Sequence, residues 1–172
     1  MLNTLTKGLG PVGLALLIAF AATPAAHAHH GWSSFDTSKA YYVRGELTYV
    51  RWGNPHTEVH IRVDATDLPA GFRSRTLPTG ADGRYGKATL ASARPYAGRH
   101  KVLHVVLAGP SWMARWGLKR PLRKGETIEV VGFVARGDPE ELRPVMFWLA
   151  DGQGVWQQLT SFPTLPEPAP GQ

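Results

Sequence analysis

Apolar and polar residues alternate along much of this chain with the period of β-strands. The clearest case is residues 56–63, where a strict alternation predicts a strand with one buried and one wet face. Val59 and Ile61 belong to the buried face. The wet face carries four polar side chains, His56, Glu58, His60 and Arg62. We expect this strand to lie in an antiparallel sheet with one side in solvent.

Other segments rich in β-branched and aromatic residues predict further strands, and one short segment predicts a helix. The first strand, residues 41–52, contains Gly45, where we expect a bend or a bulge. The helix is expected at residues 111–116, after Pro110 and before Gly117. The remaining strands are expected at residues 101–108, 127–135 and 143–149, with a weaker one at residues 155–159.

The order of these elements predicts a mainly β protein. Three strands are followed by a short helix and then by two more strands, and the first strand is long and bent. This is the order of the OB-fold, a small Greek-key barrel. We therefore predict a small OB-like five-stranded antiparallel barrel with one short helix between strands 3 and 4. The alternative is a small β-sandwich, which usually needs about seven strands.

Residues 64–100 interrupt this pattern. This segment contains six Lys or Arg residues but three Asp residues. It is rich in Gly and Pro and has no sustained periodicity of apolar residues. We predict a basic inserted loop or hairpin, with a short strand at residues 87–93, because a structureless loop of this length is unusual in a compact domain. Residues 29–160 then form a single domain. Four prolines in residues 161–172 predict an extended or disordered tail.

Residues 1–28 have the features of a secretory signal peptide. A basic start is followed by residues 11–22, which are apolar but too short to span a bilayer comfortably. Ala26 and Ala28 then offer small residues at the two positions that a signal peptidase reads. There is no twin arginine, so we expect export to the periplasm by the general secretory route, with no membrane span left after cleavage.

Composition narrows the chemistry that this domain can carry. The 43% of apolar residues supports one modest core, and the formal charge of +6 mildly favours acidic partners. The chain has no cysteine, which excludes a disulfide framework, a thiol nucleophile and a cysteine zinc site. It also lacks a Gly-rich phosphate loop and a Gly-x-Ser-x-Gly motif, so an ordinary hydrolase has no support.

Cleavage after Ala28 would create a metal-chelating residue. The α-amine of His29 and its own imidazole can bind one ion together, and His30 offers another chelate through the amine and the intervening amide. One further imidazole, from His56 or His60, would complete a three-nitrogen site of the histidine-brace kind, which suits copper. The alternative is a frayed terminus with two incidental histidines beside a solvated strand face.

The remaining histidine arrangements are weaker candidates. Neighbours in the row His56, Glu58 and His60 are about 7 Å apart on one strand face, so a flat strand does not bring all three to one ion. His104 lies among valines and is expected to be a core histidine. Copper redox chemistry at His29 is the one enzymatic reaction that these residues could support.

Aromatic and basic residues indicate where a larger ligand would bind. Trp32 and Trp52 flank the histidines and are expected to be exposed, and with Glu58 they form the predicted ligand surface. Arg115 and the basic residues that follow it as far as Lys124 are expected to form a solvated face. Export argues against nucleic acid as the partner.

Motifs spread over residues 29–152 carry a resemblance to a known family. The most specific are the double histidine that opens residues 29–32 and the Trp-x-Asn-Pro-His stretch at residues 52–56. Further motifs lie at residues 35–36, 39, 45–52, 109–111, 116–117, 122–126, 131–138 and 149–152. In these the chain resembles the domain-of-unknown-function family DUF6152. The resemblance implies an exported protein with an OB-like fold and implies no activity; the insert at residues 64–99 is longer than the family's usual turn there.

Two functions follow from these observations and stay open. The first is an exported periplasmic protein that binds copper, or passes it on, as an accessory module through His29. The alternative is a metal-independent OB-like module that binds a protein or an acidic ligand through its loops and basic surface. In both cases we expect a monomer whose partner is a protein or a metal ion.

Overall fold

The computed structural model describes residues 31–157 and 164–169. The predicted signal peptide at residues 1–28 lies outside the described residues, as do His29 and His30. Among the residues that are described, no helix is long and apolar enough to cross a membrane.

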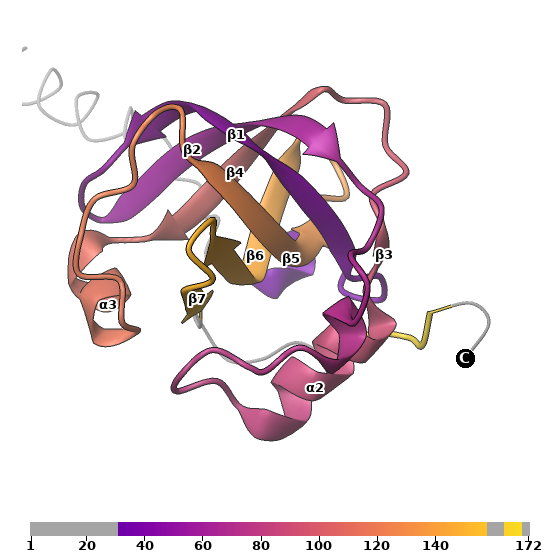
Figure 1. Cartoon of the computed structure of the whole chain (residues 1–172). Helices are drawn as coiled ribbons and strands as arrows, with labels where there is room; N and C mark the ends of the chain where they lie inside the picture. The colour runs from indigo at the N-terminus through magenta and orange to yellow at the C-terminus, as the bar shows by residue number, and fades with distance from the viewer. Residues whose placement is uncertain (1–30, 158–163, 170–172) are drawn as a thin grey trace, which may run out of the picture.

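Five strands close into a barrel (Figure 1). They are β1 (Tyr41–Arg51), β2 (His56–Ala65), β4 (Val102–Ala108), β5 (Thr127–Val134) and β6 (Glu141–Leu149). Their order around the barrel is β1-β2-β4-β6-β5, and β5 pairs with β1 to close the ring. This is the strand order of an OB-fold, so the predicted mainly β, OB-like architecture is confirmed. The barrel is mixed rather than antiparallel, because two chain reversals separate β4 from β6 and these neighbours pair in parallel.

Two helices lie between the strands. α3 (Pro110–Arg115) follows the third barrel strand, β4, as the sequence predicts. α2 (Gly83–Ser92) lies in the insert, where the sequence predicts a loop with a short strand, and that prediction is wrong. The helix is stabilised at its start by Asp82, whose carboxylate accepts a hydrogen bond from the backbone N–H of Tyr85 at 2.6 Å. The minor elements are η2 (Trp32–Ser34), η3 (Phe72–Ser74), β3 (Arg94–Pro95) and β7 (Gly154–Trp156).

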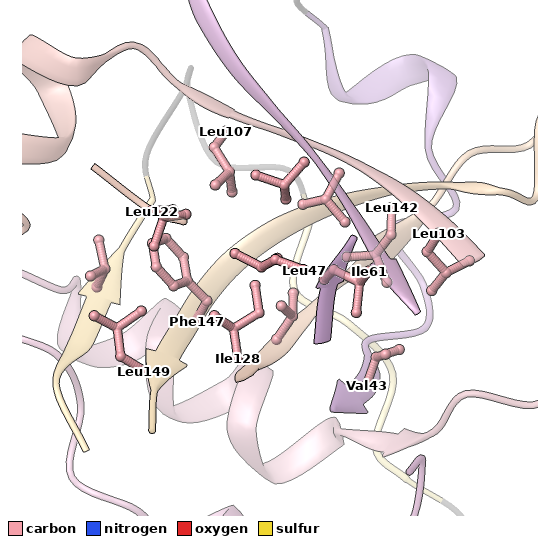
Figure 2. Packing of buried hydrophobic residues seen from close by; sticks show 14 of the residues in the cluster. Val43, Leu47, Ile61, Leu103, Leu107, Leu122, Ile128, Leu142, Phe147 and Leu149 are labelled. Atoms are coloured by element: carbon pink, nitrogen blue, oxygen red, sulfur yellow. The ribbon is translucent and has the colours of Figure 1, made fainter. Parts of the chain in front are cut away.

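The barrel interior is filled by one apolar cluster, part of which is drawn in Figure 2. Ile61, Leu103 and Ile128 point into it from three different strands, and Phe147 joins them from β6. Val59 and Ile61, which the sequence places on the buried face of β2, are 0% exposed, and the inward residues of β4 and β5 are at most 1% exposed, namely Leu103, Val105, Ile128 and Val130. The predicted alternation of β2 is therefore confirmed.

A second apolar cluster lies outside the barrel wall. Outward side chains of the strands, such as Tyr42 and Trp148, pack there against Phe72 of η3 and Leu90 of α2. The ring centroids of Tyr42 and Phe72 are 4.7 Å apart. The insert therefore covers part of the outer surface of the barrel, and we call this part the covered face.

Gly45 allows β1 to bend between the two halves of the barrel wall. The pairing of β1 with β2 shifts register between Arg44 and Gly45, which confirms the predicted bulge. A Cβ atom at Gly45 would lie 2.1 Å from the carbonyl oxygen of Arg62. A side chain at this position would therefore push the two strands apart.

Residues 164–169 of the predicted disordered tail lie against the domain. The backbone N–H of Glu167 donates to the carbonyl oxygen of Ser38 at 2.9 Å, and Arg94 donates to the carbonyl oxygen of Pro168 at 3.1 Å. Ala169 is 3% exposed. In the described part of the tail, the proline-rich chain therefore lies against the domain through carbonyl acceptors and apolar surface.

Candidate functional site

Three rings stand in a row on the outer face of β1, β2 and β4. Tyr49 lies opposite His60 in the β1–β2 pair, and His60 lies opposite His104 in the β2–β4 pair. The ring centroids of Tyr49 and His60 are 4.7 Å apart at 37°, and those of His60 and His104 are 4.3 Å apart at 17°. Because the rings stack across the strands, they turn their faces to one another and their edges to solvent. We call this outer surface the histidine face.

His104 points away from the barrel interior, so the prediction of a core histidine is wrong. Its neighbours Leu103 and Val105 are 0% and 1% exposed and pack inside the barrel. Alternation along the strand therefore turns His104 outward together with Val102 and Val106. β4 carries apolar residues on both faces, which is why its sequence also suits a buried histidine.

The neighbourhood of His60 disfavours a charge on its ring. Burial lowers the pKa of His60 below its ordinary value of 6.5, the neighbouring His104 lowers it further, and Glu58 opposes both effects. At pH 7 the His60 imidazole is therefore neutral and offers one N–H donor and one acceptor nitrogen. The middle of the row presents a hydrogen-bonding edge without a charge.

Two ion pairs flank the row and balance the charges around it. Arg51 Nε donates to Glu58 at 3.1 Å, and Arg62 Nη2 donates to Glu46 at 2.6 Å. The hydrogen bond from Arg51 is the main reason that the pKa of Glu58 lies below its ordinary value. Glu58, a predicted member of the ligand surface, thus lies on the histidine face with its charge already paired.

The histidines of this face do not form a ready metal site. His56, Glu58 and His60 share the outer side of β2, as predicted, yet no group of three His, Cys, Asp or Glu residues in the described part of the chain could hold a metal ion. Ring nitrogens bind a metal in the plane of the ring, at about 2.0–2.1 Å for zinc. The nearly parallel rings of His60 and His104 would have to turn before both could reach one ion.

Both tryptophans of the predicted ligand surface are half-buried rather than exposed. Trp32 packs against the cluster outside the barrel, and the guanidinium carbon of Arg143 lies 4.3 Å from its ring centre. Trp52 packs against the cluster inside the barrel. Among the described residues, the large exposed aromatic side chains are Tyr49 at 42% and Trp112 at 52%.

The described chain begins beside β6, and Trp32 packs there on the cluster outside the barrel. Arg143 of β6 donates a hydrogen bond from Nη1 to the carbonyl oxygen of Gly31 at 3.1 Å. β6 is the neighbour of β4, and His104 lies opposite Glu141 in that pair. Gly31, two residues after the predicted N-terminus His29, is thus held on the strand beside the one that carries His104.

A cavity of about 510 Å³ separates the insert from the barrel wall, and its walls include Arg44, Arg75, Glu129 and Trp148. Arg75 Nη1 lies 2.6 Å from Glu129 Oε2, and its guanidinium carbon lies 5.0 Å from the ring centres of both Phe72 and Trp148. The charge of Arg75 is therefore paired and its side chain is packed between rings. We assign this arginine to holding the insert on the covered face.

Comparisons with known proteins find one family model that matches part of the chain, and they indicate no function. No curated protein matches the chain. Among solved structures, the crystal structure of TiaS in complex with an isoleucine transfer RNA and ATP is similar, with a TM-score of 0.34 and 13% identity, covering 64% of this chain and 18% of that chain. This likeness is too low to say anything of function. The model of the "Family of unknown function (DUF6152)" matches residues 17–72, so the resemblance that the motifs predict is confirmed over this stretch.

Proposed function

We propose that this protein is an OB-fold binding module, exported to the periplasm, which holds a protein segment on its histidine face. The observation that carries the proposal is the row of Tyr49, His60 and His104 on the outer side of three strands, in which Tyr49 and His104 are exposed and His60 is half-buried. OB-folds bind their ligands on the face of the corresponding strands. A row of three rings has no role inside the barrel, because it lies on the opposite side of the wall from the core.

The chemistry of the row suits a protein backbone better than a polyanion. Tyrosine and histidine are rigid rings that lose little conformational entropy when a partner orders them. Their edges supply a hydroxyl and ring nitrogens, which can bond to N–H and C=O groups of a peptide. Flanking cations Arg51 and Arg62 are already paired with carboxylates, so the face offers no surplus positive charge for nucleic acid.

Site-specific photo-crosslinking in the living cell tests this proposal. Val102 is 37% exposed and lies two residues from His104 on the same face of β4. With p-benzoylphenylalanine in place of Val102, we expect one discrete periplasmic adduct. The matched control places the crosslinker at Lys87, an exposed position of α2. Adducts of equal yield from both positions, or none from Val102, would reject the proposal.

Copper binding through His29 is the second candidate, and one observation favours it. Gly31 is anchored by Arg143 on the strand next to β4, which leaves the predicted N-terminus two residues away from this anchor. His60 or His56 would supply the third nitrogen. If His60 does so, its ring has to move off the ring of His104. A protein that carries this site would bind or pass on copper as an accessory module.

A copper titration separates the two candidates. Protein processed in the cell to begin at His29 is compared with a variant that keeps one methionine before His29, which moves the α-amine away from the chelate. We expect weaker copper binding in that variant and in His60→Ala. His100→Ala is the matched control, because His100 bonds to Glu140 at 2.9 Å outside the histidine face. Equal affinities in all four proteins would exclude the copper site.

A further inference from the structure

An exposed tryptophan marks the end of the barrel that α3 closes. Met113 of α3 is 0% exposed and points into the barrel, whereas Trp112 is 52% exposed. The Trp112 ring stacks on Trp116 at 5.8 Å, and the guanidinium carbon of Arg115 lies 4.8 Å from its centre. The exposed indole of Trp112 and the half-buried ring of Trp116 thus form an aromatic patch at this end of the barrel.

The loop after α3 adds positive charge beside this indole. Leu118 and Leu122 are buried in the barrel cluster and fix the loop on the domain. The residues between and after them point outward and are basic: Lys119, Arg120, Arg123 and Lys124. Arg120 pairs with Glu126 at 2.7 Å.

Four cations of this region have no carboxylate partner among the described residues: Arg115, Lys119, Arg123 and Lys124. Together with Trp112 and Trp116 they form what we call the tryptophan end. In Figure 1, α3 and its loop project at the rim of the barrel, apart from α2.

We propose that the tryptophan end docks on the surface of an anionic lipid bilayer. Tryptophan prefers the interface between headgroups and acyl chains, where its ring is buried and its N–H stays near water. Basic residues near an anionic membrane each strengthen binding about fivefold, and the attraction falls off within a Debye length. A bilayer supplies dense negative charge without a fixed geometry, which suits long, unpaired side chains that converge on no pocket.

Vesicle co-sedimentation of the purified protein tests the proposal. The two probes are vesicles of phosphatidylcholine alone and vesicles that also contain about 30% phosphatidylglycerol, whose negative surface attracts basic residues. We expect sedimentation with the anionic vesicles and its loss at high salt. Trp112→Ser should lower the bound fraction severalfold at low salt without changing the unfolding midpoint, because this side chain is mostly exposed.

Charge-matched variants show whether the location of the cations matters. Lys119→Gln/Arg123→Gln/Lys124→Gln removes three charges from the tryptophan end, and we expect a loss of about a hundredfold in partitioning. Arg84→Gln/Lys87→Gln/Arg99→Gln removes three exposed charges from the insert and should retain most of the binding. Equal losses in both triple variants would overturn the proposal. Equal binding to both kinds of vesicle, or none to either, would also overturn it, and an acidic protein would then be the partner of these cations.

Discussion

Two tyrosines of β1 lie on the outer wall of the same barrel, and one is buried whereas the other is exposed. Tyr42 is 0% exposed, because Phe72 of the insert packs edge-on against it, whereas Tyr49 is 42% exposed and its ring lies tilted against that of His60. Burial on the covered face raises the pKa of Tyr42 to about 12. Packing of the insert thus explains the large apolar side chains of the covered face. The fold does not require the rings of the histidine face. This difference is the reason to place binding on the histidine face.

The largest expected effect lies in the barrel interior, which both faces share. Ile61→Asp places a carboxylate at a position that is 0% exposed, and it also removes a side chain whose burial contributes about 1.5–3 kcal/mol. We expect the whole domain to unfold, as measured by the loss of near-ultraviolet circular dichroism. Ile61→Val is the control and should remain folded. A folded Ile61→Asp variant would contradict the register of β2.

On the covered face, Phe72→Ala should destabilise the protein strongly. The Phe72 ring contacts Tyr42, and its centroid lies 5.7 Å from that of Trp148. We expect a loss of about 3 kcal/mol, at the lower end for truncation of a buried phenylalanine. Urea unfolding followed by tryptophan fluorescence measures it. A change below about 1 kcal/mol would mean that the insert contributes little to the domain.

The ion pair of the covered face should have a moderate effect. Arg75→Gln removes the partner of Glu129 and the contacts with the Phe72 and Trp148 rings. We expect a loss of about 1 kcal/mol, because both charged groups are partly exposed. The control Arg84→Gln changes an exposed arginine of α2 and should leave the urea midpoint unchanged. Equal urea midpoints for the two variants would contradict the structural role that we assign to Arg75.

On the histidine face, substitution should cost little stability. Tyr49→Ser deletes one cross-strand ring contact, which contributes roughly 0.2–1 kcal/mol. We expect an unfolding free energy close to that of the wild type, measured as for Phe72→Ala. A loss as large as that of Phe72→Ala would show that the row is a packing element, and the contrast between the two faces would disappear.

The smallest effect is a dependence on pH. Because the pKa of His60 is lowered in the folded protein, the unfolded chain takes up its proton first as the pH falls through 6.5. The free energy of unfolding should therefore decrease from about pH 7 towards pH 5 and stay constant above that range as far as His60 is concerned. His104→Gln removes the neighbouring imidazole and should make the decrease smaller. An unchanged pH profile in that variant would contradict the coupling of the two rings.

The sequence is sufficient to predict the architecture, because the alternation of each strand and the order of the elements are local features that the small barrel retains. The inward set around Ile61, the bulge at Gly45 and the helix after β4 all follow from patterns within a few residues. The sequence does not predict the helix α2, because Asp82 and the scattered apolar residues of the insert are equally typical of a loop. The helix packs against the outer wall of the barrel, and this tertiary contact is not visible in the local sequence. Parallel pairing of β4 and β6 depends on closure of the whole ring, which no local pattern encodes.

The site was harder to predict, because it depends on register between strands. Alternation in β2 places His60 outward, yet nothing in its neighbours along the chain indicates that Tyr49 and His104 lie on either side of it. The register shift between Leu47 and Tyr49 sets the outward direction of Tyr49, and it arises from pairing rather than from sequence period. Trp32 and Trp52 were expected at the surface because they flank histidines in sequence, but the two clusters bury half of each.

The most direct test of the histidine face combines the crosslinker at position 102 with substitution of the rings in the row. The adduct formed through the crosslinker at position 102 is quantified in the wild-type background, in Tyr49→Ser/His60→Ser and in the stability-matched control Arg84→Gln. If the row binds the partner, the adduct is lost in the double variant and kept in the control, while both variants keep the free energy of unfolding within about 1 kcal/mol of the wild-type value. An adduct of undiminished yield in the double variant would contradict the assignment of binding to Tyr49, His60 and His104.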